Sequence, residues 1–210
     1  MSVRQTRRYA PATRRNRVPI LEVLRQELPA VGTILETGSG TGEHAVYFAR
    51  ALKPRIYLPS EPNPELRASI EGWCMDSSSA NLRMPLDLDV TDSEWPVEGE
   101  PKPVPAISAI LTINMIHIAS WRICLGILAG AGRILGEGGV LYFYGPFKQE
   151  NVSFGSSNEA FDLSLRSENP NWGVRSLEEV TDAAVKEGLS LRKTVHMPAG
   201  NLSVIYERLY

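Results

Sequence analysis

The chain has 210 residues, of which 43% are hydrophobic and 22% are charged, and its formal net charge is −2. This length suits one domain with its own core, and so small a net charge gives no argument for nucleic acid or an anionic membrane as partner. Cys74 and Cys124 lack metal-ligand spacing, and no apolar run approaches the roughly 18 residues that span a bilayer, so we expect a cytoplasmic, reducing compartment.

The first 18 residues are basic. Six arginines at positions 4, 7, 8, 14, 15 and 17 precede the first acid, Glu22. An Arg-rich, acid-free start can be an organelle transit peptide or a nucleic-acid arm. However, Pro11 and Pro19 interrupt this segment, and no apolar helical face is visible in it. We therefore expect residues 1–18 to form a partly ordered arm that could act as a lid over a single domain at residues 19–210.

The rest of the chain alternates between short apolar runs and helical patterns. In chain order we expect a helix at 20–28, a strand at 33–35, a helix at 43–52, a strand at 55–58, a helix at 64–73, a strand at 81–88, a loop at 98–105, a strand at 106–113, a helix at 120–135, a strand at 140–144, an insertion at about 149–173, a helix at 176–187 and an antiparallel pair of strands at 189–196 and 202–208. Such alternation favours an open, mostly parallel sheet with helices on both faces.

The most informative segment is the turn after the first strand, where Glu36 precedes Gly38, Gly40 and Gly42. Glycine lacks a Cβ, so this turn can adopt positive φ and let a ligand lie against the backbone. The third glycine comes one residue earlier than in the dinucleotide pattern G-x-G-x-x-G, and Glu36 would repel a pyrophosphate. A ligand with an amine and no phosphate suits the acid, which favours S-adenosylmethionine over NAD. The alternative is a plain strand-to-helix turn.

Polar residues stand at the ends of four predicted strands, namely Glu36, Glu61, Asp89 and Asn114. Ligands of open parallel sheets bind outside the carboxyl ends of the strands, so we expect these side chains to converge on one site. Asp87 shares a strand face with Asp89 and is the fallback for it. No histidine accompanies these two carboxylates, so we expect no metal.

Blocks along the chain match a known pattern. They are Arg15-Asn16-Arg17 with Pro19-Ile20-Leu21, Glu36-x-Gly38-Ser39-Gly40-Thr41-Gly42-x-His44-Ala45, Pro59-Ser60-Glu61-Pro62, Leu86-x-Leu88-Asp89-Val90, Asn114-Met115-x-His117-Ile118, Gly138-Gly139-x-Leu141-Tyr142-x-Tyr144-Gly145-Pro146-Phe147, Ser157-Asn158-x-Ala160-Phe161-Asp162, Trp172-Gly173 and Met197-Pro198-Ala199-x-Asn201-Leu202. On these blocks the chain resembles class I S-adenosylmethionine-dependent methyltransferases, and more narrowly the methyltransferase-like 26 group, also called the DUF938 family.

The resemblance implies a Rossmann-like class I methyltransferase fold, with a mostly parallel seven-stranded sheet whose last strand is antiparallel. It implies S-adenosylmethionine as cofactor and a role for each residue that matches the family's cofactor pattern. Glu36 and Gly38 would border the methionine part of the cofactor, and Gly40 would border the adenosine. Glu61 would bind the ribose hydroxyls and Asp89 the adenine amine, while Asn114 would line the methyl-transfer mouth. Gly42 would belong to the turn, and Asn16 and Arg17 would close over the cofactor as a lid. The family often has Asp in place of Glu61, and some relatives have Ala-Ser in place of Thr37-Gly38.

Residues near the end of the fourth strand are candidates for the chemistry itself. His117 follows Asn114 by three residues and could act as a general base, since the unperturbed pKa of histidine is near 6.5, or it could be structural. Tyr144 could line an acceptor pocket with Phe161 and Trp172, or fill the core. For His44 a packing or hydrogen-bonding role is the favoured interpretation.

These observations predict methyl transfer from S-adenosylmethionine to a small-molecule N, O or S acceptor by in-line displacement. A base is needed only if the acceptor must lose a proton. Two alternatives remain, an NAD-linked oxidoreductase and a non-catalytic S-adenosylmethionine-binding regulatory module. Nothing in the sequence names the acceptor or the oligomeric state.

Overall fold

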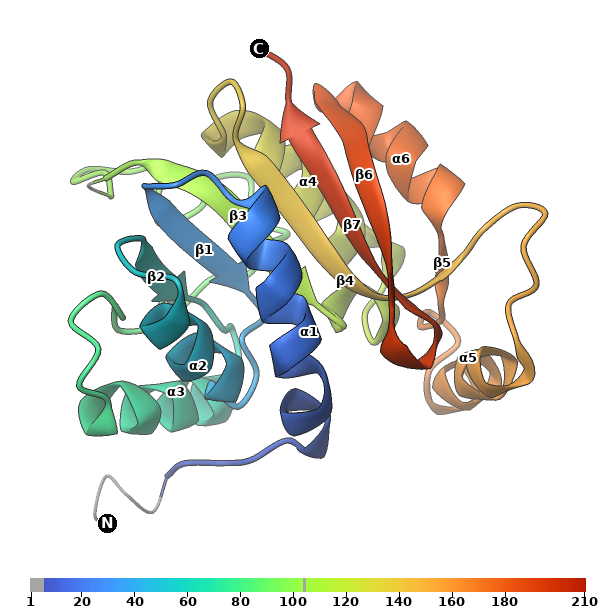
Figure 1. Ribbon diagram of the computed structural model, residues 1–210, viewed down its shortest axis with the longest axis horizontal. Coiled ribbons are helices and arrows are strands. Elements are labelled where there is room, and N and C mark those ends of the chain that lie inside the picture. The colour runs from blue at the N-terminus through green and yellow to red at the C-terminus, as the bar shows by residue number, and fades with distance from the viewer. Residues whose placement is uncertain (1–5, 104) are drawn as a thin grey trace.

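The computed structural model describes residues 6–103 and 105–210, and a seven-stranded sheet forms its centre (Figure 1). Six strands follow the order β2-β1-β3-β4-β7-β6, and β5 pairs separately with β4. Only β7 runs antiparallel to its neighbours, which confirms the predicted mostly parallel sheet with an antiparallel last strand. The strands are β1 (Thr33–Thr37), β2 (Ile56–Pro59), β3 (Ile107–Ile113), β4 (Val140–Lys148), β5 (Arg175–Ser176), β6 (Leu189–Met197) and β7 (Asn201–Arg208).

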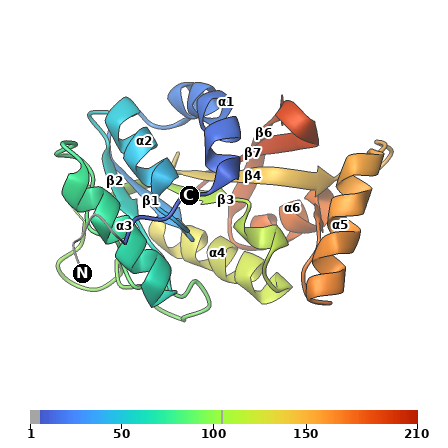
Figure 2. The same ribbon diagram turned by 90° about the horizontal axis from the view of Figure 1, so that it is seen from below.

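Helices cover both faces of the sheet, as Figure 2 shows with α1 and α2 on one side and α4 and α6 on the other. The sequence accounts for where several of them begin. Asn63 caps α3 by accepting hydrogen bonds from two backbone N–H groups, and Ser176 caps α6 by accepting one from the N–H of Glu179. The helices are α1 (Pro11–Glu27), α2 (Glu43–Ala51), α3 (Pro64–Asp76), α4 (Trp121–Ile134), α5 (Ser156–Glu168) and α6 (Leu177–Lys186), with short 3₁₀ turns η2 (Met115–His117) and η3 (Pro198–Gly200).

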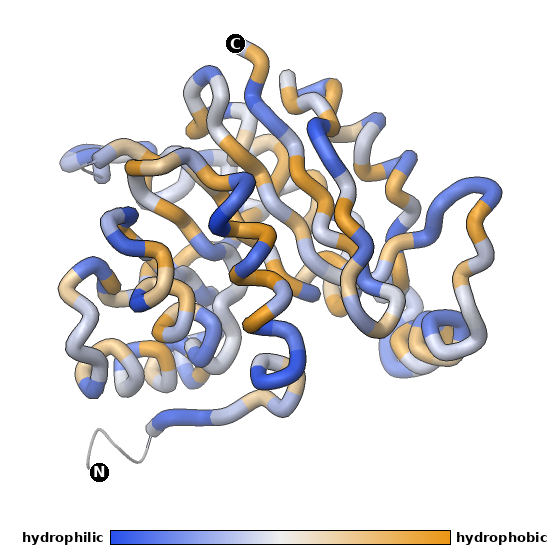
Figure 3. Tube along the Cα trace, viewed as in Figure 1, coloured by the Kyte–Doolittle hydropathy of each residue, from blue (hydrophilic) through white to orange (hydrophobic). Residues whose placement is uncertain are grey.

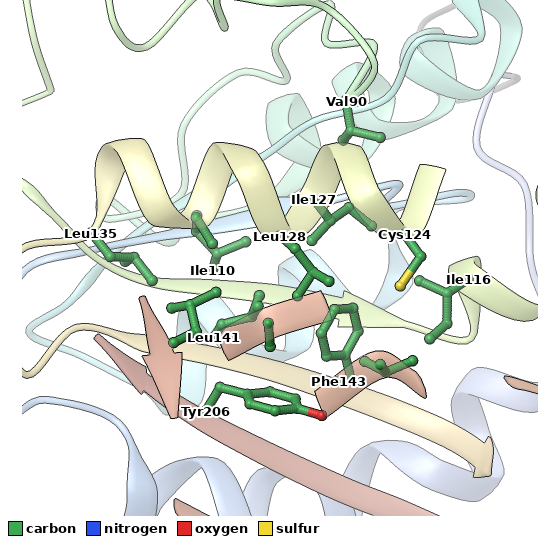
Figure 4. Close-up of a cluster of buried hydrophobic side chains, with 14 of the residues drawn as sticks. Val90, Ile110, Ile116, Cys124, Ile127, Leu128, Leu135, Leu141, Phe143 and Tyr206 are labelled. Atoms are coloured by element: carbon green, nitrogen blue, oxygen red, sulfur yellow. The ribbon is translucent and has the colours of Figure 1, made fainter. Parts of the chain in front are cut away.

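Each face of the sheet has its own hydrophobic core, and Figure 3 shows hydrophobic stretches running through the central strands. Figure 4 draws the core under α4, where Ile127 and Leu128 of the helix lie over Leu141 and Phe143 of β4. Phe143 and Tyr206 meet there edge to face, with ring centroids 6.1 Å apart. None of the helices among the described residues combines the length and apolar character needed to cross a bilayer.

The predicted strand at 81–88 is wrong. This segment touches β2 only through two isolated bridges, Tyr57 with Leu82 and Ser60 with Leu86. Between them lies Pro85, which has no N–H to offer a ladder, and the neighbouring Met84 is exposed. Alternating polarity alone could not reveal that the pairing is interrupted.

The N-terminal boundary differs as well, because the predicted boundary between residues 18 and 19 falls inside α1. Pro11 occupies the first turn, where its missing N–H leaves no hydrogen bond unmade, and the helix continues through Pro19. Residues 1–5 of the predicted arm lie outside the described residues. Figure 3 shows why the segment looks unlike a helix in sequence: the first turns of α1 are hydrophilic.

The predicted insertion at about 149–173 contains one regular element, α5. Only Asp162 and Leu165 of this helix are buried, so its apolar pattern is too weak to predict from sequence. Asp162 attaches the helix to the body by accepting hydrogen bonds from Lys148 Nζ and the backbone N–H of Val174.

Candidate functional site

A cavity of about 350 Å³ opens at the carboxyl edge of the sheet, between the ends of β1, β2 and β3 and the first turn of α1. Its size falls within the range of roughly 300–1,000 Å³ typical of small-molecule sites. Five of the predicted site residues line it, namely Glu36, Gly38, Gly40, Glu61 and Asn114. The structure therefore brings together three of the four polar strand ends that were expected to converge, those of Glu36, Glu61 and Asn114.

The glycine turn forms the back of this cavity. Gly38 and Gly40 have φ values of 62° and 55°, the left-handed region that glycine occupies at little cost. At Gly38 space is limiting too, because a Cβ would lie 2.5 Å from Met115 Sδ. At Gly40 a Cβ would meet no protein atom within 4 Å, so the backbone is open toward the cavity. Hydrogen bonds between Ser39 and Ser60 fasten the turn to the end of β2.

Glu36, the last but one residue of β1, forms the polar floor of the cavity. Its side chain is only 2% exposed, and its Oε2 atom has no hydrogen-bond partner among the described residues. Burial raises the pKa of this carboxyl to about 7, and the nearby charge of Glu61 adds to the rise. A buried acid with a free oxygen is a receptor for a cationic donor, since buried polar groups are almost always paired.

Glu61 follows β2 and connects the two strand ends. Its Oε2 accepts a hydrogen bond of 2.9 Å from the Gly40 N–H, and its Oε1 accepts one of 3.1 Å from the Asn63 N–H. Burial raises the pKa of Glu61, and these two backbone donors oppose the rise. Each carboxylate oxygen can accept more than one hydrogen bond, so both remain able to receive hydroxyl donors from the cavity.

Asn114 completes the group of strand ends. It follows β3 with a left-handed backbone (φ 60°), and its N–H donates to the Tyr144 carbonyl of β4 at a distance of 2.8 Å. This bond holds the turn at the junction of the two central strands. Asn114 lines the cavity beside Met115.

Asp89, its fallback Asp87 and Gly42 do not line the cavity. Asp89 is exposed, and its Oδ1 accepts hydrogen bonds from the N–H and hydroxyl of Thr91. The fallback Asp87 pairs instead with Arg67. Gly42 lies outside the lining because its bare Cα serves packing: a Cβ would lie 3.0 Å from the Cα of Ile70 on α3.

Asn16, Arg17 and Tyr144 stand behind the cavity wall and are not part of it. Asn16 is buried and its Oδ1 is 2.8 Å from Nε2 of His44, while Arg17 stacks on the Tyr47 ring. Burial raises the pKa of Tyr144, and a hydrogen bond with Asn16 partly offsets that rise. Asn16 and Arg17 thus contact α2 and do not line the cavity, and their closing over the cofactor as a lid stays a prediction.

His117 is also withdrawn from the cavity. Its imidazole is 1% exposed, packs edge-on against Phe147 and lies where a Cβ on Gly145 would be. Burial, helped by the charge of Arg175, lowers the pKa of His117 to about 3. A group that is buried and this weakly basic is poorly suited to deprotonate an acceptor, so its predicted role as a base gains no support from this placement.

Thr13 and His44 are two of the polar lining residues that sequence reasoning did not assign to the site. His44 lies in the first turn of α2 with its ring parallel to that of Phe48, the centroids 5.2 Å apart. Burial, with the charge of Arg17, lowers its pKa to about 4, so its ring is neutral near pH 7. The position of His44, two residues after Gly42 of the glycine turn, is the feature of the sequence that could have identified it as a lining residue. Thr13 has no such feature, because only the folding of α1 brings it to the site.

The side chains that line this cavity fit a zwitterionic nucleoside. Glu36 suits an ammonium group, Glu61 suits a vicinal diol, and the apolar Leu66, Met115 and Ile118 of the same lining suit a flat ring. A pyrophosphate would lie against two carboxylates and be repelled. Among the described residues no group of three or more His, Cys, Asp or Glu side chains is arranged to hold a metal ion.

Comparisons with known proteins agree with this arrangement. A family model described as "Protein of unknown function (DUF938)" matches residues 7–208. Among solved structures, the S-adenosylmethionine-dependent methyltransferase SibL in its apo form has a TM-score of 0.74 at 15% identity, with 94% of this chain and 56% of that chain covered. An O-methyltransferase family 2 protein from Planctomyces limnophilus DSM 3776, in complex with apigenin, also has a TM-score of 0.74, at 18% identity, with 94% and 58% covered.

A third solved structure, CalO1, a methyltransferase in calicheamicin biosynthesis in its SAH-bound form, has a TM-score of 0.69 at 14% identity, with 91% of this chain and 53% of that chain covered. This chain therefore spans little more than half the length of these proteins. At such identities the likeness shows the fold, which is the class I methyltransferase fold.

Proposed function

We propose that this chain, which belongs to the DUF938 family and has a class I methyltransferase fold, transfers the methyl group of S-adenosylmethionine to a small-molecule N, O or S acceptor. The observation that carries the proposal is the buried carboxylate of Glu36, which lines a cavity bounded by the glycine turn and Asn114 and whose Oε2 has no hydrogen-bond partner among the described residues. The two carboxylates of that lining disfavour a phosphate, and an ammonium satisfies the acid.

Each lining residue then has a defined task. Glu36 binds the ammonium of the methionine part, with the Gly38 backbone beside it. Glu61 binds the ribose hydroxyls while it holds the Gly40 N–H, and the apolar lining near Met115 and Ile118 takes over the adenine contact that was predicted for Asp89. Asn114 lies where the two central strands diverge and borders the methyl-transfer mouth.

When bound, S-adenosylmethionine supplies a methyl group that is already activated by the sulfonium. The protein therefore needs to position two partners and exclude water, and good orientation by itself can lower a barrier by about 7–11 kcal/mol. Neither histidine at the site is a strong base, because the pKa of His44 is near 4 and that of His117, outside the lining, is near 3, and the two carboxylates of the lining, Glu36 and Glu61, are engaged by the cofactor in this proposal. We infer an acceptor that reacts in its neutral form or loses its proton to water.

Titration calorimetry with S-adenosylmethionine, S-adenosylhomocysteine and NADH tests the proposal. We expect micromolar binding of the two sulfur nucleosides and no binding of NADH, because Glu36 and Glu61 repel a pyrophosphate. Binding of NADH alone would favour the alternative of an NAD-linked oxidoreductase.

The acceptor can be sought with a methyl-labelled donor and a panel of metabolites. Labelled product would establish turnover and identify the acceptor class. Retained cofactor binding without transfer to any member of the panel would favour the alternative of a non-catalytic S-adenosylmethionine-binding module.

A further inference from the structure

Tyr57 lies directly beneath the floor of the cofactor cavity. It belongs to β2, and its register partner on β1 is Ile34, two residues before Glu36. Residues two apart in a strand share a face, so the Tyr57 ring and the Glu36 carboxylate occupy the same side of the sheet on adjacent strands. Tyr57 is 0% exposed, and Phe48 of α2 packs on it with ring centroids 6.4 Å apart.

The two side chains present complementary polar atoms. Neither the Tyr57 hydroxyl nor Glu36 Oε2 has a hydrogen-bond partner among the described residues, although both atoms are buried. A buried hydroxyl without an acceptor beside a buried carboxylate oxygen without a donor is rare in folded proteins. The two groups also influence one another. Burial raises the pKa of Tyr57, and the charge of Glu36 raises it further. Burial also raises the pKa of Glu36, and the Tyr57 hydroxyl opposes that rise.

We propose that Tyr57 is a positioning residue for cofactor binding: its hydroxyl donates to the Glu36 carboxylate from below and turns the ionised acid toward the ligand's ammonium. This inference rests on the proposed function, since it takes S-adenosylmethionine or its product as the ligand. A hydrogen bond from a neutral phenol favours the ionised carboxylate, which is the form that an ammonium needs.

The surroundings of Glu36 make a change at Tyr57 measurable. The titratable or charged groups that face this region are Tyr57 of β2, Glu61 after β2, His44 of α2 and, behind His44, Arg17 of α1. Glu61 raises the pKa of Glu36, whereas His44 stays neutral above pH 5. Glu36 is thus the group expected to change its protonation when a cation binds near pH 7.

The sign of the pH dependence follows. In the free protein the pKa of Glu36 is about 7, so the carboxyl is partly protonated at neutral pH. An ammonium bound beside it lowers that pKa, so binding releases a proton, and affinity increases as the pH increases toward and through 7. Removing the Tyr57 donor raises the free-state pKa further, which moves both effects to higher pH.

The experiment is calorimetric titration of S-adenosylhomocysteine into wild type and Tyr57→Phe, from pH 6 to 8.5, in paired buffers of different ionisation enthalpy. We expect binding to Tyr57→Phe to be about tenfold weaker at pH 7, as for a lost hydrogen bond to a charged group, with proton release shifted to higher pH. Tyr57→Phe keeps the ring against Phe48, so a purely packing role would leave affinity and proton release unchanged.

Two control variants show where the effect arises. Tyr142→Phe removes another buried phenol, one that bonds Ser203 on β7 away from the cavity, and we expect wild-type binding. In a Glu36→Gln background, proton release should disappear and Tyr57→Phe should cause no further loss of affinity.

The outcomes separate the two proposals. Failure of wild type to bind S-adenosylhomocysteine or S-adenosylmethionine overturns the proposed function. Binding by wild type that Tyr57→Phe leaves unchanged, in affinity and in proton release at every pH, overturns the role of Tyr57 alone. A loss that persists in the Glu36→Gln background also overturns it, because Tyr57 would then act by another route.

Discussion

Glu61 shows how one side chain can build a site and also serve it. Its carboxylate holds the Gly40 N–H at one oxygen and the Asn63 N–H at the other, and so joins the glycine turn to the start of α3. Glu61 also lines the cavity. Its side chain is long enough to hold both N–H groups, and its oxygens can accept further hydrogen bonds from a diol.

Substitution of Glu61 tests this double role. Glu61→Ala removes the diol acceptor and the anchor of the turn, so we expect S-adenosylhomocysteine to bind more than about tenfold more weakly. Glu61→Gln keeps an oxygen for the Gly40 N–H and should lose less. Calorimetry measures both variants, with Glu65→Gln, an exposed acid on α3, as control. Wild-type affinity in Glu61→Ala would remove the ribose assignment.

The segment before α1 contributes a wall of the site by lying across two other helices. The Arg8 N–H donates to Ser69 Oγ at 2.8 Å, Trp73 Nε1 donates to the Arg8 carbonyl at 3.2 Å, and the Tyr9 ring meets Trp73 edge-on. The Ala10 N–H donates to the Glu43 carboxylate. Because these contacts bring Ala10 into the lining, cofactor binding and the docking of this segment on α3 should stabilise one another.

Limited digestion with trypsin tests this coupling, since Arg7 and Arg8 are cleavage sites within the segment. Trp73→Ala removes the ring contact and the hydrogen bond to Arg8, so we expect faster cleavage there than in wild type, and saturating S-adenosylhomocysteine should slow the cleavage of wild type. Met75→Ala, an exposed position on the same helix, is the control. Equal cleavage rates in wild type and Trp73→Ala would show that the segment is held by other contacts.

The sheet and its two cores hold the site as one unit, because the three strand ends that line the cavity lie between helices of both faces. Trp95, in the connection between α3 and β3, is 1% exposed and fills a gap on α4 that only a glycine leaves. A Cβ at Gly130 would lie 2.2 Å from Trp95 Cζ2. The core under α4 thus depends on a fit between a loop and a helix that are distant in sequence.

Gly130→Ala should therefore destabilise the whole domain. Alanine improves helix propensity by about 1 kcal/mol, but overpacking costs about 1–3 kcal/mol or more, and we expect the loss to dominate. Urea unfolding followed by tryptophan fluorescence measures the free energy of unfolding. Gly136→Ala, where a Cβ meets no atom within 4 Å, is the control. Equal stability of wild type and Gly130→Ala would show that Trp95 moves aside freely.

The amino-acid sequence by itself determined that the central strands of the sheet are parallel and that the last strand is antiparallel, and it identified five residues that line the cavity. These follow from local patterns, since apolar runs that alternate with helices leave little choice of topology, and the carboxyl ends of parallel strands meet at one edge. Glu36, Gly38, Gly40, Glu61 and Asn114 could be identified for that reason. The DUF938 family match over residues 7–208 is consistent with the same motifs.

Tertiary structure alone decided which polar side chains face the cavity. Asp89 turns to Thr91, His117 is buried under β4, and Thr13 reaches the site because α1 begins at Pro11. Tyr57 lies below Glu36 through the register of β1 and β2. Side-chain direction and burial depend on contacts between segments far apart in the chain, and no local pattern of residues encodes them.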